Sequence, residues 1–119
     1  MPPRRPQVQP PRFDVQLGQQ VLQVVTKQLG SLWVIRSFLD RLGLVDIIDR
    51  QCPAGSRTTL SHGQVVAALV ANRLTAPRPL YRVQDWASMW AVEEVLGIAP
   101  TELNDDRLGR TLDAIYPHL

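Results

Sequence analysis

The stretch that decides the fold is LSHGQVVAALVANRL, residues 60–74. Ser61 and Gln64 stand at the two positions of a capping box, in which each side chain satisfies one backbone donor at a helix start. Leu60 and Val65 flank this box as a hydrophobic staple. Because the residues that follow are apolar almost all round the helix, the stretch predicts the central and most buried helix of the domain.

Two helices are predicted before this one. Ser31 is expected to cap the first of them, and Gly43 is expected to end it in the left-handed conformation. A short second helix follows from Leu44 to about Gln51, and residues 52–56 read as a turn. The inner face of the first helix is expected to consist of Leu32, Ile35, Leu39 and Leu42, with Phe38 beside them.

Two further helices are predicted after the central one. The prolines within residues 75–79 end the central helix, because proline disfavours helix in the residue before it. A fourth helix starts at about Leu80, and residues 92–96 either continue it or bend away. The last helix opens with Asn104 as its N-cap and ends at Pro117. The expected inner stripes of these two helices are Val83, Trp86, Ala87 and Trp90, and Leu108, Leu112 and Ile115.

The N-terminal quarter of the chain differs in composition. Residues 1–12 hold five of the ten prolines and three arginines, which predicts a disordered basic arm. Residues 13–30 read as a linker in which 21–26 is either one β-strand or a poor helix. A lone strand would need its partner on another chain or on a missing segment. The predicted fold is therefore an all-α bundle of about five short helices over residues 31–117, with a lone strand at 21–26 left open.

Length and composition limit the classes of function. A chain of 119 residues is one domain, and it is too short to be a metal-dependent nuclease, a kinase or a dehydrogenase by itself. Cys52 is the single cysteine, so the chain has no internal disulfide and fits a reducing cytoplasm. No apolar run approaches the ~20 residues of a membrane span. We therefore expect a cytoplasmic protein with no membrane contact.

Arginine dominates the basic residues. Lys27 is the only lysine among thirteen basic side chains, at a formal net charge of +2. The arginine guanidinium is a forked donor suited to phosphate groups. Arg73, Arg78 and Arg82 surround the loop after the central helix, and Arg107 and Arg110 lie on the last helix. These five residues are the predicted DNA-binding set, and a solvated face with local ion pairs is the alternative.

The remaining polar and aromatic side chains predict no catalytic residue, no metal site and no cofactor. Asp105 and Asp106 suit the first turn of a helix better than a metal, because sequential residues point about 100° apart. His62 and His118 lack partners at zinc-ligand spacing, and His62 is expected to be solvated. Cys52 has no neighbouring base and is read as inert. Trp86 and Trp90 are expected to pack in the core rather than stack on bases.

The central stretch also carries a resemblance to a known family. Residues 60–83 are similar to the N-terminal domain, itself uncharacterised, of a group of bacterial insertion-sequence transposases of the DDE type. The resemblance covers roughly residues 30–117. It includes the blocks FLDRLGL (38–44), DIIDR (46–50), Trp86-Ala87 with Trp90, EEVLGI (93–98), LNDDRLGR (103–110) and LDAIY (112–116). Ala91 stands where the family is expected to have a glycine, which suggests that the fourth helix runs on more continuously here.

The resemblance implies a function together with its limits. In such transposases, catalysis belongs to a downstream RNase H-like domain whose three acids hold two divalent metals. No such segment precedes Leu119, so we expect a non-enzymatic accessory domain that binds DNA at the element ends, as a truncated or split product. The alternatives are a dimerisation module, a docking module for the catalytic domain, or a non-functional remnant. The partners would be DNA, a transposase catalytic domain or a second copy.

Overall fold

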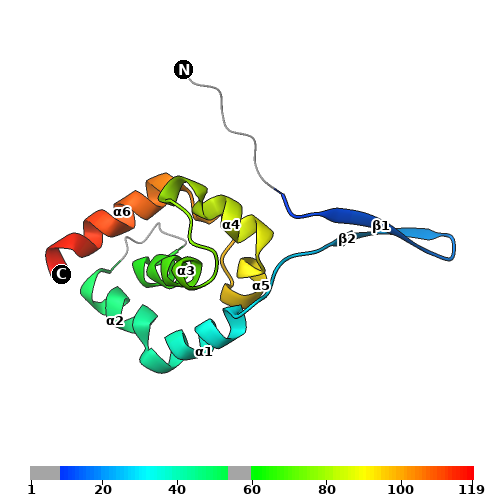
Figure 1. Cartoon of the computed structure of the whole chain (residues 1–119). Helices are drawn as coiled ribbons and strands as arrows, with labels where there is room; N and C mark the ends of the chain where they lie inside the picture. The colour runs from blue at the N-terminus through cyan, green and yellow to red at the C-terminus, as the bar shows by residue number, and fades with distance from the viewer. Residues whose placement is uncertain (1–8, 54–59) are drawn as a thin grey trace, which may run out of the picture.

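The computed structural model describes residues 9–53 and 60–119 of the chain. A body of α-helices and a separate two-stranded hairpin make up the described part (Figure 1). The predicted helical bundle is therefore confirmed, and a small sheet is added to it. In chain order the elements are β1 (Arg12–Leu17), β2 (Gln20–Val25), α1 (Leu32–Leu42), α2 (Leu44–Gln51), α3 (His62–Leu74), the 3₁₀ turn η1 (Leu80–Arg82), α4 (Val83–Met89), α5 (Val92–Leu96), η2 (Pro100–Glu102), α6 (Asp105–Ile115) and η3 (Tyr116–His118).

Helix α3 is the centre of the domain, as predicted. Figure 1 shows it enclosed by the other helices, and it packs against α1, α2, α4 and α6. Its start is the predicted capping box: the Ser61 Oγ accepts from the Gln64 N–H at 3.1 Å, and the Gln64 Oε1 accepts from the Ser61 N–H at 3.0 Å. Leu60 and Val65 are buried on either side of the box, in the staple positions.

Helix α1 confirms only part of its predicted inner face. The first three residues of the stripe are buried, namely Leu32, Ile35 and Leu39. The prediction is wrong for Leu42 and Phe38, which are 66% and 59% exposed. Gly43 (φ 64°) turns the chain directly into α2, so Leu42 lies at an outward corner between the two helices. Ser31 stands before α1 without a side-chain cap bond, because its φ of −92° and ψ of 11° are near-helical rather than extended.

A β-hairpin replaces the predicted linker and lone strand. Strand β2 has its partner in the same chain, since it pairs antiparallel with β1 through the two-residue turn at Gly18 and Gln19. Gly18 has a φ of 64°, the positive value that such turns place on glycine. The missed signal is the alternation of apolar and polar residues in RFDVQL, which has the strand period of two. The hairpin starts at Arg12, inside the range predicted as a disordered arm; residues 1–8 of that arm lie outside the described residues.

The fourth helix is broken after Met89, so residues 92–96 bend away as a separate helix, and Ala91 does not make the fourth helix run on. Trp90 is extended, with a φ of −101° and a ψ of 160°. The backbone of Gln28 occupies the break: its N–H donates to the Met89 carbonyl at 3.0 Å, and its carbonyl accepts from the Ala91 N–H at 2.7 Å. This tertiary bridge supplies partners for the interrupted helix, so no glycine is needed at position 91.

An ion pair joins the segment between β2 and α1, which includes Gln28, to helix α5. The Lys27 ammonium lies 2.6 Å from the Glu94 Oε1. This hydrogen bond holds the pKa of Glu94 below its usual value. The base of the hairpin is thus fixed to the helical body by both backbone and side-chain bonds, whereas the strands extend away from it (Figure 1).

Helix α6 begins as predicted and packs differently. The Asn104 Oδ1 accepts from the Arg107 N–H at 2.9 Å, which confirms Asn104 as the N-cap. Leu103 and Leu108 are fully buried. The prediction that Leu112 faces inward is wrong, because it is 42% exposed and lines a shallow groove between α3 and α6; Thr111 takes the buried position. None of the helices in the described ranges has the length and apolar content of a membrane span.

Candidate nucleic-acid interface

The loop 75–79 joins α3 to η1 and lies at the centre of the predicted arginine cluster. Asn72 of α3 is 2% exposed and bonds to this loop. Its Nδ2 donates to the Ala76 carbonyl at 3.0 Å, and its Oδ1 accepts from the Arg78 N–H at 3.1 Å. A side-chain amide therefore supplies partners that backbone loses at a helix end. These bonds fix the backbone of Arg78 relative to the core.

A second set of bonds fixes the start of the loop. The Thr75 Oγ1 donates to the Ala71 carbonyl at 2.8 Å and accepts from the Trp86 Nε1 at 2.9 Å. Trp86 is buried in the core, and the half-buried Trp90 packs against this core. Both tryptophans are thus core residues, as predicted. The start of the loop is consequently held by both α3 and α4, and its far end at Arg78 is held by Asn72 of α3.

Arg73, Arg78 and Arg82 come from three successive segments around this loop, and all three are exposed. The Arg82 guanidinium carbon lies 5.9 Å from the centroid of the Tyr81 ring. The Arg78 guanidinium donates to the Pro77 carbonyl at 3.3 Å. Within the described residues, no ion pair ties any of the three to a carboxylate. Their positive charge is therefore presented to solvent.

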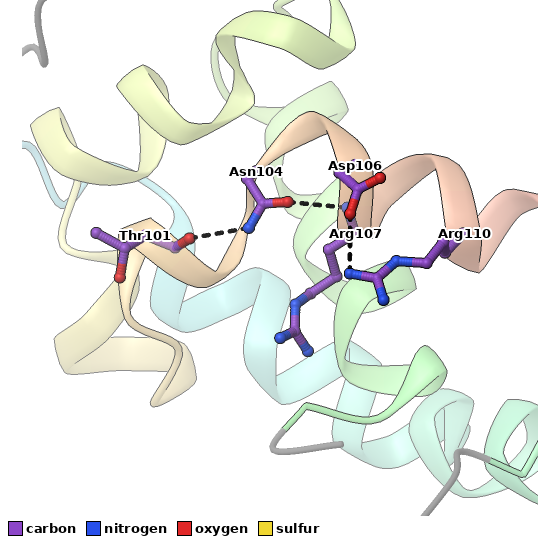
Figure 2. Close-up of polar contacts among 5 residues, drawn as sticks. All are labelled: Thr101, Asn104, Asp106, Arg107 and Arg110. Atoms are coloured by element: carbon purple, nitrogen blue, oxygen red, sulfur yellow. Dashed lines mark hydrogen bonds and ion pairs between the residues drawn. The ribbon is translucent and has the colours of Figure 1, made fainter. Parts of the chain in front are cut away.

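The two arginines of α6 behave differently from this group, although η1 packs against the same helix. Arg110 forms an exposed ion pair with Asp106 at 3.1 Å. Figure 2 shows the Arg107 side chain directed away from Asp106 and Arg110. Its Nε is buried and has no hydrogen-bond partner in the described part of the chain. The structure therefore separates Arg107 from the predicted set.

The acidic pair occupies the helix-start position that was predicted for it. Asp105 and Asp106 lie in the first turn of α6, where the helix dipole favours negative charge. Across residues 9–53 and 60–119, no group of three or more His, Cys, Asp or Glu side chains is arranged to hold a metal ion. The acids are accounted for by the helix dipole and by the ion pair of Asp106 with Arg110.

His62 differs from its prediction, and Cys52 lies in the core. His62 is half-buried rather than solvated, because its Nδ1 lies 2.9 Å from the Thr111 Oγ1 across the contact of α3 with α6. Cys52 is buried, and its Sγ lies 3.6 Å from the Ala114 carbonyl. Both side chains therefore join α6 to the rest of the body. Arg57, beside the central helix in sequence, lies outside the described residues.

The geometry defines a class of protein: a small helical domain that presents a fixed, arginine-bearing loop. A family model described as a domain of unknown function, DUF4277, matches residues 24–118. The chain therefore belongs to this family. No curated protein matches it, and no solved structure does. The family description gives no activity, so the site must be interpreted from its own chemistry.

Proposed function

We propose that this domain is the DNA-binding accessory domain of an insertion-sequence transposase, and that it has no catalytic role of its own. The observation that carries the proposal is the loop 75–79, which buried side chains fix and three exposed arginines surround. Arginine and backbone groups on ordered loops are typical phosphate contacts. The resemblance to transposase N-terminal domains supplies the biological context.

Each side chain has a place in this interface. Arg73, Arg78 and Arg82 contact phosphates, and the Tyr81 ring beside the Arg82 guanidinium packs on the sugar–phosphate backbone. Arg110 adds a contact once its exposed pair with Asp106 opens, since such pairs contribute little. Arg107 is left out of the interface because of its turned side chain and its buried Nε.

A charge-reversal experiment tests the proposal. We expect Arg73, Arg78 and Arg82 changed together to Glu to weaken binding by about tenfold or more, and to reduce the slope of log affinity against log salt by about 3. The measurement is fluorescence anisotropy with two duplexes of equal length. One is copied from the ends of the element that encodes the chain, and the other is scrambled.

The matched control changes three other exposed arginines, Arg12, Arg41 and Arg50, to Glu. Its net charge is identical, so it separates a local contact from a general loss of positive charge. We expect the control to keep most of the salt slope. If the first variant binds both duplexes with unchanged affinity and slope, the DNA-binding role is rejected.

A second candidate function is assembly with another protein chain. The observation that favours it is the hairpin, which extends from the helical body and leaves Phe13, Val15, Val21 and Val25 exposed. Exposed apolar residues on a strand with a free edge are typical of a pairing surface. This role is compatible with DNA binding through the loop, because the two features lie on different elements.

A further inference from the structure

Among the described residues, neither outer edge of the hairpin is paired with another strand, and the two edges differ in character. The tight turn makes Leu17 and Gln20 a hydrogen-bonded pair, and at the other end the Thr26 N–H donates to the Pro11 carbonyl at 3.1 Å. Because such pairs alternate along antiparallel strands, the backbone groups of Val21, Gln23 and Val25 point away from β1. Strand β2 therefore presents a full row of outward donors and acceptors.

Nothing in the sequence of β2 protects this edge. QVLQVV contains no charged residue and no proline, and Val21 and Val25 are 66% and 44% exposed. The edge of β1 is protected in the ways that natural edge strands use, by the prolines at 10 and 11 and by the charges of Arg12 and Asp14. The asymmetry indicates that β2 is the edge kept open for pairing.

The open edge is complementary to itself. A two-fold axis through Gln23 places Gln23 opposite the partner's Gln23, and Val21 opposite the partner's Val25. The exposed apolar residues of this face thus meet each other, and no like charges face each other. All the backbone donors that this register needs are present, because the strand lacks proline.

We propose that two copies of this chain associate through β2, forming a four-stranded antiparallel sheet in the order β1-β2-β2-β1. An isolated two-stranded hairpin is at best marginally stable in water, so pairing with two further strands would stabilise it. The pairing fits a second copy better than DNA, since the outward groups of β2 are neutral and the charges of Arg12 and Asp14 on β1 sum to zero. The proposal specifies the assembly role named above and does not depend on the loop arginines.

A charge placed on the axis tests the pairing. Gln23→Lys puts two like charges opposite each other in the dimer, so we expect the dimer dissociation constant to rise by about tenfold or more. Gln16→Lys is the matched control, because Gln16 pairs with Val21 on the same face but lies on the β1 edge. We expect the control to dimerise like the unmodified chain. Sedimentation velocity across roughly a hundredfold range of concentration gives both constants.

A covalent trap keeps the test decisive if the lysine variant folds poorly. Residues opposed in a hydrogen-bonded pair have Cα atoms about 5.5 Å apart, within the range that a disulfide spans. In a Cys52→Ala background, Gln23→Cys is therefore expected to give a covalent dimer under mild oxidation, and Gln16→Cys to remain monomeric. A monomeric unmodified chain, or equal cross-linking by the two cysteine variants, overturns the proposal. DNA affinity measured on the same variants separates this outcome from that of the loop.

Discussion

Gly63→Ala is expected to destabilise the domain by about 3 kcal/mol, because the added methyl group has no space. Gly63 lies where α3 crosses α2. A Cβ at this position would overlap the Val45 carbonyl oxygen and lie 2.7 Å from the Asp49 Oδ1. The same carboxylate accepts the Gly63 N–H at 2.7 Å, so moving the helices apart would also lengthen this bond. Urea denaturation followed by circular dichroism measures the effect.

Gly109→Ala is the control for this prediction. Gly109 lies within α6, and a Cβ there meets nothing within 4 Å. Alanine is preferred over glycine inside a helix, so we expect this variant to gain about 0.5–1 kcal/mol. Opposite signs for the two variants would show that crowding at α2, rather than helix propensity, decides the outcome at Gly63. A Gly63→Ala variant as stable as the unmodified domain would contradict the close crossing.

Local signals predicted the helices well, because the partners involved are near in sequence. The capping box of Ser61 and Gln64, the left-handed Gly43 and the Asn104 cap each depend on residues within one helical turn, and the structure confirms all of them. Predictions that depended on neighbours far along the chain were less successful. The break at Trp90 depends on the backbone of Gln28, and nothing near Trp90 in sequence announces it.

The hairpin was not predicted for a different reason. The period-two pattern runs unbroken through residues 12–17, with Gln16 at a polar position, but the prediction considered a strand only at 21–26. The turn at Gly18 was the second overlooked signal. Inner faces were also hard to place near helix ends, as Leu42 and Leu112 show, because burial there depends on where the next element packs.

The arginines of the candidate interface were predicted from sequence, whereas Asn72, which fixes the backbone of Arg78, was not. Arg73, Arg78 and Arg82 stand out by their clustering around two prolines. Asn72 carried one signal: it is the one amide at the end of the apolar run that follows Gln64, which commonly means a buried polar group with specific partners. Which partners it has could not be predicted, since the loop conformation sets them.

Asn72→Leu is expected to destabilise the domain by about 2–3 kcal/mol and also to weaken DNA binding severalfold under conditions where the variant is folded. The leucine has a similar size but removes the donor to Ala76 and the acceptor for Arg78, leaving both backbone groups without their partner. Urea denaturation measures the stability. Anisotropy at low temperature, with the duplexes used for the charge reversals, measures the affinity.

Thr75→Val separates stability from positioning in this prediction. Valine keeps the shape of threonine and removes the hydroxyl that bonds the Trp86 Nε1 and the Ala71 carbonyl, at a cost of about 1–2 kcal/mol. It leaves the bonds of Asn72 to Ala76 and Arg78 in place. If the loop binds DNA because Asn72 holds Arg78 in position, Thr75→Val should lose stability and keep its affinity. Equal losses of affinity in the two variants would instead mean that loop order as a whole, and not the anchor at Arg78, governs binding.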